Sequence, residues 1–425
     1  MIKTLFSLPL AAIILAGCGP AAADTTSATA ADDRSKTDTI TILQTADIHG
    51  QLNVHDELFY ENGEIVFKRR GGIASIKTIF DRTRAANPEG TIILDGGDLI
   101  QGSAVAALSE GRAFVPLVRE LGFDFLIPGN WEVVYGKNKM LDVMRDYQTP
   151  VIAANMFDAE TGETLFPPYF IKEVKGLKLG FISYNDPEVP IRQNPSFSVG
   201  MDFTPVEHNL TDLITELKEN EGVDVLFIVS HIGIAKQMHL ANHPALKHVD
   251  YVLGNDTHER IRQPLQGKYA KVTEPGAFGS FVGRLDLVIQ DGKVVDEIYE
   301  LVEVDPEVYE PDAAMQALVD AERAEFEKDV DEVWAQTTTP LYRYFVVENP
   351  MDNLITDAAR WKTGADISLS NGFRFSPPLF ASEDAPADIT AGYVWNMLPV
   401  NEYVKTGKAT GEQIENWLEQ EIHNV

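Results

Sequence analysis

Short apolar runs recur along this chain and restrict its fold more than any other feature of the sequence. Stretches with helical spacing lie between them, and Gly or Pro often marks the boundaries. Apolar runs of roughly four to eight residues are typical of strands buried on both faces. The pattern therefore predicts an α/β sandwich. The predicted strands are Thr39–Gln44, Thr91–Leu94, Phe123–Ile127, Pro150–Ala154, Leu177–Ser183, Val223–Val229, Val249–Leu253 and Arg284–Ile289, and the predicted helices between them are Ile73–Ala86, Ala104–Leu121, Asn138–Asp146 and His208–Glu219.

Polar clusters directly follow several of these predicted strands. Binding groups in open α/β sheets collect beyond the carboxyl ends of the strands. Carboxylate, amide and imidazole side chains held at separate strand ends can ligate divalent cations. The sequence therefore predicts a metal site. Its clusters are Asp47–Gly50, Gly96–Asp98, Gly129–Glu132, Ser230–His231 and Asn255–His258.

The N-terminus has the pattern of a secretory signal. Lys3 precedes an apolar stretch from Leu5 to Leu15, and small residues lead to Cys18. The segment resembles a bacterial lipobox, which would make Cys18 a lipidated residue; the alternative is a non-lipidated signal in which Cys18 is incidental. Because Cys18 is the only cysteine, no intramolecular disulfide can form. Residues 1–18 are expected to be the signal peptide and 19–38, which lack bulky side chains, a disordered tether.

Composition and spacing divide the rest of the chain. A net charge of −30 disfavours binding to nucleic acid or to anionic lipid. Residues 39–305 are expected to form one large domain and 306–334 a linker, with one helix over Asp312–Val333. A smaller α/β domain is expected at 335–425. Its predicted elements are a helix at Asn353–Trp361, a strand at Asp366–Ser370, a loop at Asn371–Arg374 and a helix at Gly411–Glu421.

In order, the strand-end clusters resemble the calcineurin-like metallophosphatases, in the 5′-nucleotidase branch where a second, substrate-binding domain follows. The resemblance covers about residues 39–425 and implies a two-sheet sandwich. It implies one metal ion at Asp47, His49, Asp98 and His258, and a second at Asp98, Asn130, His231 and Asp256. A hydroxide bridging the two ions would be the nucleophile. Manganese is the expected metal, with magnesium, zinc and calcium as alternatives.

This chain departs from the family pattern at two site positions. Among the catalytic positions Asp98, Asn130 and Trp131, the last usually holds a His, and indole cannot shuttle a proton near neutral pH. Asp256 stands where the family commonly has a metal-binding His. Its carboxylate is a competent, harder ligand, unless the side chain faces away from the metal.

A second resemblance is to the periplasmic thiosulfohydrolases, which use two manganese ions to cut a sulfonate from a cysteine persulfide on a partner protein. Those enzymes carry His before the Trp, whereas this chain has Asn130. The motifs that carry this resemblance are Gly97-Asp98, Gln101-Gly102-Ser103, Trp131-Glu132, Tyr135-Gly136 and Gly372-Phe373-Arg374.

The second domain limits the substrate prediction. The resemblance assigns Asn371 and Arg374 to substrate-anion binding, and a guanidinium suits phosphate and sulfonate alike. Leu398-Pro399 is followed by Val400 and Asn401, where nucleotidases usually place a base-stacking aromatic residue. The family normally continues with further strands beyond the position of Val425, so this sequence is expected to be either a fragment or a protein without a complete substrate domain.

The sequence favours a hydrolase of 5′-nucleotides or other phosphate esters on the periplasmic side of a bacterial membrane, attached only by its lipid anchor. One alternative is sulfonate cleavage on a sulfur-carrier protein. The other is a metal-binding lipoprotein without turnover.

Overall fold

The computed structural model describes residues 38–345, 348–370, 372 and 376–423. The predictions for Cys18, Asn371 and Arg374 therefore fall outside the described residues. The described residues belong to one compact unit that begins at Asp38. None of the described helices is both long enough and apolar enough to span a bilayer.

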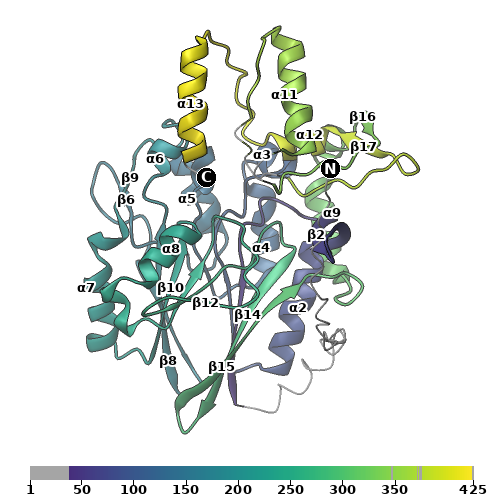
Figure 1. The fold of residues 1–425 in the computed structure, drawn as a ribbon. Coiled ribbons are helices and arrows are strands. Elements are labelled where there is room, and N and C mark those ends of the chain that lie inside the picture. The colour runs from purple at the N-terminus through teal and green to yellow at the C-terminus, as the bar shows by residue number, and fades with distance from the viewer. Residues whose placement is uncertain (1–37, 346–347, 371, 373–375, 424–425) are drawn as a thin grey trace, which may run out of the picture. The chain divides into compact units, whose positions relative to one another are not determined.

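Two sheets form the centre of this unit (Figure 1). Their strands are β1 (Thr39–Thr45), β4 (Thr91–Asp95), β5 (Phe125–Leu126), β7 (Tyr169–Val174), β8 (Leu177–Asn185), β10 (Val225–His231), β11 (Tyr251–Gly254), β12 (Leu265–Gln266), β13 (Lys271–Thr273), β14 (Phe281–Gln290) and β15 (Lys293–Glu303). The five-stranded sheet has the order β15-β14-β1-β4-β5 and the six-stranded sheet the order β12-β13-β11-β10-β8-β7. Within them, β1 runs parallel to β4, and β10 runs parallel to β8 and β11. Parallel strands place their carboxyl ends at the same edge of a sheet.

Alternate residues of the central strands face different cores. In β10, Val225, Phe227 and Val229 join a buried cluster that also contains side chains of β1, β4 and β14 from the other sheet. Leu226 and Ile228 of the same strand join a second cluster with the outer helices. Both faces are buried, which explains why these strands read as continuous apolar runs.

Helices cover the outer face of each sheet. The outer side of the five-stranded sheet packs on α2 (Ile73–Ala86), α4 (Val115–Leu121), α5 (Lys137–Asp146) and α9 (Ala313–Ala324). The six-stranded sheet packs on α7 (Leu210–Thr215) and α8 (Ile234–Ala241). The predicted two-sheet α/β sandwich is confirmed.

Two predicted elements of the sandwich are wrong. The single helix expected over Ala104–Leu121 is divided into α3 (Ala104–Ser109), a short 3-10 turn at Arg112–Phe114, and α4. Glu110 and Gly111 have φ of 51° and 78°, and left-handed residues end a helix. The strand expected at Pro150–Ala154 makes only an isolated bridge through Val151, because the Ala153 and Ala154 amides donate to Pro167 and Ser183 instead.

The segment after the sandwich also differs from expectation. The helix predicted over Asp312–Val333 is instead α9, then α10 (Glu327–Val330), and then β16 (Val333–Thr337), which pairs with β17 (Ala387–Thr390). Asp366–Ser370 adopts no regular strand. The remaining helices of this region are α11 (Pro350–Thr363), α12 (Ala391–Met397) and α13 (Gly411–His423), and its buried core consists of Leu341, Met351, Ile389 and Met397.

Candidate metal centre

Strand ends from both sheets supply the candidate ligands. Asp47 and His49 follow β1, Asp98 follows β4, and Asn130 follows β5 in the five-stranded sheet. In the six-stranded sheet, His231 is the last residue of β10, and Asp256 and His258 follow β11. All seven predicted ligand positions therefore lie just beyond carboxyl ends of strands, or at one.

Most of these residues have a left-handed backbone. The φ angles of Asp47, His49, Asp98, Asp256 and His258 are 51°, 50°, 56°, 89° and 61°. Such conformations are uncommon for residues other than Gly and cost on the order of 1–3 kcal/mol each. They persist only where the surrounding structure holds them, and a concentration of such residues in one set of loops is typical of functional sites.

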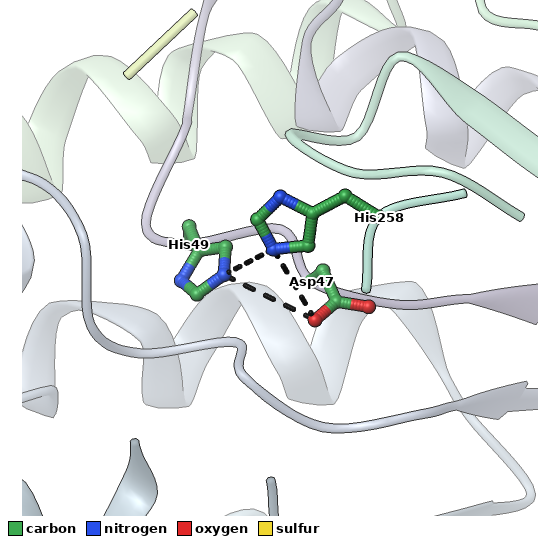
Figure 2. A group of neighbouring side chains, drawn as sticks. All are labelled: Asp47, His49 and His258. Carbon is green, nitrogen blue, oxygen red and sulfur yellow. Dashed lines mark hydrogen bonds and ion pairs between the residues drawn. The ribbon is translucent and has the colours of Figure 1, made fainter. Parts of the chain in front are cut away.

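The Asp47 carboxylate lies at the centre of three histidines. Its Oδ1 lies 4.0 Å from His49 Nε2, 3.8 Å from His231 Nε2 and 3.6 Å from His258 Nε2. Figure 2 shows the Asp47 carboxylate facing both His49 and His258, whose Nε2 atoms are 3.0 Å apart. Asp47 is fully buried, and in the described part of the chain no hydrogen-bond donor reaches Oδ1. A buried oxygen that faces three ring nitrogens fits a bound cation.

Asp98 lies between two of these histidines. Its Oδ2 lies 3.2 Å from His231 Nε2 and 3.7 Å from His49 Nε2. The Asn130 side-chain oxygen lies 3.1 Å from His231 Nε2, and Asp256 Oδ1 lies 3.8 Å from the same nitrogen. His231 therefore has carboxylate and amide oxygens around it.

Backbone carbonyls fix the orientation of two imidazoles. His49 Nδ1 lies 2.9 Å from the Gln101 carbonyl oxygen, and His231 Nδ1 lies 2.8 Å from that of Gly96. A carbonyl only accepts hydrogen bonds, so each Nδ1 carries the proton and each Nε2 faces the carboxylates. Metal-binding histidines in proteins are held in this way.

The electrostatics of the cluster favour a positive charge at its centre. Burial raises the pKa of Asp47 well above its ordinary value, although His231 opposes the shift. Burial acts to lower the pKa of His231, but Asp98 and Asp47 outweigh it, and the pKa lies well above its usual range. Within the part of the chain that the structure describes, two compact groups could hold an ion: Asp47, His49 and His258, and Asp47, Asp98 and His231. The donor set of imidazoles and carboxylates fits divalent metal ions.

The structure adds a residue to which the sequence assigned no role. Glu132 is buried; its Oε1 accepts hydrogen bonds from the Leu99 and Ile100 amides at 2.7 and 3.3 Å. Its Oε2 accepts from the Asp98 and Gly129 amides at 2.9 and 2.6 Å. One carboxylate thus joins the loop of Asp98 to the loop of Asn130. Its position two residues after Asn130, within the Gly129–Glu132 cluster, was the available signal.

Trp131 contributes to the site through its backbone. Its amide donates to Asp98 Oδ1 at 2.8 Å, and its side chain is only 8% exposed. The Trp131 backbone therefore orients the carboxylate that lies between the histidines.

Comparison with known proteins identifies the family of both parts of the chain. The calcineurin-like phosphoesterase model matches residues 40–263, and the 5′-nucleotidase C-terminal domain model matches residues 333–425. A 5′-nucleotidase of Vibrio vulnificus is 27% identical over 340 residues, 72% of this chain and 57% of the relative. Protein UshA of Escherichia coli is 23% identical over 448 residues, 91% of this chain and 76% of the relative. The chain spans only 56–57% of the length of its three Vibrio relatives.

Solved structures share the fold. The sulfate thiohydrolase SoxB of Thermus thermophilus superposes with a TM-score of 0.76 at 20% identity, covering 84% of this chain and 73% of that one. A 5′-nucleotidase precursor of the same species superposes with a TM-score of 0.73 at 23% identity, covering 85% and 74%. The chain belongs to the calcineurin-like phosphoesterase family, and it continues into a 5′-nucleotidase C-terminal domain.

Proposed function

We propose that this chain is a metal-dependent phosphomonoesterase whose substrates are 5′-nucleotides or similar phosphate esters. The observation that carries the proposal is the buried convergence of Asp47, Asp98 and three histidine Nε2 atoms. We assign one ion to Asp47, His49, Asp98 and His258, and the other to Asp98, Asn130, His231 and Asp256. Sharing of Asp98 is supported by the position of its Oδ2 between His49 and His231.

The donor atoms support manganese. Carboxylate and amide oxygens suit manganese, magnesium and calcium, whereas imidazole nitrogens suit transition metals, zinc among them. Manganese is a transition metal that the oxygen donors suit as well. When bound, two such ions would activate a water molecule and neutralise charge on the phosphate. The protein orients the imidazoles through Gln101 and Gly96 and the Asp98 carboxylate through the Trp131 amide.

Phosphate release from nucleotides and simple phosphomonoesters by the manganese-loaded protein tests this proposal. Asp98→Asn is the matched blank, because the amide keeps the size of the side chain and removes its charge. We expect turnover by the natural chain, and loss of turnover and of bound manganese in the variant. Two ions per chain retained in Asp98→Asn would contradict the assigned site.

A second candidate function is hydrolysis of a sulfonate from a cysteine persulfide carried by a partner protein. The observation that favours it is the presence of Trp131 at this position: its amide contacts Asp98, and its indole has no acidic proton near neutral pH. A persulfide sulfur leaves more readily than an alkoxide and needs less protonation. The substrate for a test is a peptide with a cysteine persulfide whose outer sulfur carries the sulfonate. Release of sulfate from this peptide, with no release of phosphate from any phosphomonoester, would favour this function. If neither substrate reacts although two ions are bound, a metal-binding lipoprotein without turnover is favoured.

We also propose that Cys18 carries a lipid that anchors the protein on the periplasmic side of the membrane. The support is the sequence of the first 18 residues. Mass spectrometry of the N-terminal peptide should find an acylated Cys18, and Cys18→Ser should release the protein from the membrane fraction.

Substrate-anion binding by Asn371 and Arg374 is proposed as well, on their place in the second domain. Arg374→Gln should then raise KM more than it lowers kcat. The domain division at 39–305, 306–334 and 335–425 is proposed with it.

A further inference from the structure

A group of charged side chains lies beside Asp256, on the outer side of the metal centre. Asp186 follows β8, and Arg192 is the last residue of the short helix α6 (Val189–Arg192). Lys236 lies on α8. None of the three was predicted to be part of the site.

Arg192 connects this group to the metal centre. Its Nη1 lies 2.5 Å from Asp186 Oδ2 and 3.5 Å from Asp256 Oδ2. The other oxygen of Asp256, Oδ1, lies 3.8 Å from His231 Nε2. The Arg192 guanidinium therefore contacts one candidate ligand, Asp256, and only that carboxylate separates it from His231.

The neighbouring residue holds this segment against the site. Gln193 donates from Nε2 to the backbone oxygen of Asn130 at 2.7 Å. The segment that carries Arg192 is thus attached both to the Asn130 loop and to Asp256. Its position relative to the metal centre is fixed at two points.

Lys236 shares the neutralisation of Asp186. Its Nζ lies 3.3 Å from Asp186 Oδ1 and 2.6 Å from Glu188 Oε2. The Asp186 side chain is fully buried and that of Asp256 is 9% exposed, whereas that of Arg192 is 35% exposed. Asp186 is therefore paired with both Arg192 and Lys236, whereas Lys236 makes no recorded contact with Asp256 among the described residues.

A carboxylate at position 256 has a cost for anion binding. It adds a negative charge to a site that must attract a phosphate, in a chain whose net charge is already −30. A cation within about 4 Å of that carboxylate offsets its field where water is largely excluded. Both ion pairs recorded for Arg192 among the described residues use Nη1, so the guanidinium has further donors.

We propose that Arg192 offsets the charge of Asp256 and thereby sets the affinity of the metal-loaded site for the phosphate of its substrate. The inference rests on the proposed function. By this inference, Arg192 is a specificity-determining residue for anionic substrates. Phosphate affinity should be preserved only when the charges of Arg192 and Asp256 are both kept or both removed.

Binding of inorganic phosphate to the manganese-saturated full chain, measured by isothermal titration calorimetry, tests the inference without turnover. Arg192→Gln should weaken binding about tenfold, and Arg192→Lys should retain most of the affinity. Lys236→Gln is the matched control, because it removes a cation that contacts Asp186 but not Asp256. It should change the affinity by less than about twofold.

A double variant separates the proposed role from a structural one. In Arg192→Gln combined with Asp256→His, a positive and a negative charge are lost together, so phosphate affinity should return to within about threefold of the natural chain. Manganese content and the thermal midpoint are measured for every variant. The inference is wrong if the double variant binds phosphate as weakly as Arg192→Gln does. It is also wrong if Arg192→Gln loses manganese, because Arg192 would then act on the structure of the site through Asp186.

The controls distinguish failure of the inference from failure of the proposed function. Equal phosphate affinity in the natural chain and Arg192→Gln would overturn the inference alone. No phosphate binding by a natural chain that holds two manganese ions would overturn the proposed function and the inference with it.

Discussion

Trp131 is the residue whose chemistry departs most from what phosphate-ester hydrolysis needs. Its amide orients Asp98, and any residue except Pro can supply that contact. Its indole has no proton to give to a leaving alkoxide near neutral pH. Trp131→His keeps the backbone contact and adds a general acid, and such groups contribute roughly 10²–10⁴-fold. We therefore expect phosphomonoesterase kcat to rise at least about tenfold, measured at saturating manganese.

The control for this variant is Trp131→Phe, which removes the indole without adding an acid. It should not raise kcat. If Trp131→His gives no gain while both ions remain bound, protonation of the leaving group does not limit turnover, and the phosphate-ester proposal loses support.

Glu132 is expected to determine the stability of the site loops. Each of its oxygens accepts hydrogen bonds from two backbone amides, so Glu132→Gln would place an NH₂ group against two N–H donors. Each buried donor left without an acceptor costs about 1–3 kcal/mol. Urea denaturation of the metal-free protein should show the free energy of unfolding reduced by about 2–6 kcal/mol. The exposed Glu160→Gln should change it by less than about 0.5 kcal/mol, and an unchanged value for Glu132→Gln would show that the loops do not depend on this carboxylate.

At the scale of elements, the loops after β4 and β5 approach too closely for any side chain at Gly129. A Cβ there would lie 2.2 Å from Asp98 Oδ1 and 2.4 Å from the Asp98 amide nitrogen. Gly129→Ala must push the loop of Asp98 away from that of Asn130. We expect the sandwich to remain folded by circular dichroism, while manganese affinity falls by at least about tenfold. Gly407→Ala, where a Cβ would have open space, is the matched control; equal manganese affinity in both variants would contradict this account.

Burial on both faces decided which elements could be predicted. The central strands β1, β4, β8 and β10 lie between two cores, so their apolar runs are uninterrupted and their positions were predicted. The hairpin of β2 (Val54–Glu61) and β3 (Glu64–Gly71) was missed, because charged residues such as Lys68 and Arg69 interrupt it. Pro150–Ala154 has the composition of a strand, but its amides find acceptors in separate segments.

The candidate site was predictable where single residues at strand ends carry its chemistry. Parallel pairing fixes where strands end, and the structure brings the following residues together at or beyond those ends: Asp47, His49, Asp98, Asn130, His231, Asp256 and His258. Glu132 acts through backbone amides, and Arg192 acts through another carboxylate. Such contacts join segments far apart in sequence and leave no spacing pattern that a sequence could show.

At the scale of the whole molecule, both sheets supply ligands to the candidate metal centre. Asp47, His49, Asp98 and Asn130 come from the five-stranded sheet, and His231, Asp256 and His258 from the six-stranded sheet. The two sheets already share a large apolar core. Ions held by ligands from both sheets would link the two sheets a second time. They would also offset the electrostatic repulsion that exists among the buried carboxylates when no metal is bound.

Manganese should therefore stabilise the folded chain. An ion that binds only the native state adds about 2.7 kcal/mol at a free concentration 100 times its Kd. For a domain of this size we expect the thermal midpoint to rise by at least about 3 °C, and to fall again when a chelator is added. The exposed Asp142→Asn should show the same rise, whereas Asp98→Asn should lose most of it. An equal rise in Asp98→Asn would mean that manganese acts by binding the acidic surface of a chain with a net charge of −30, and not through the buried centre.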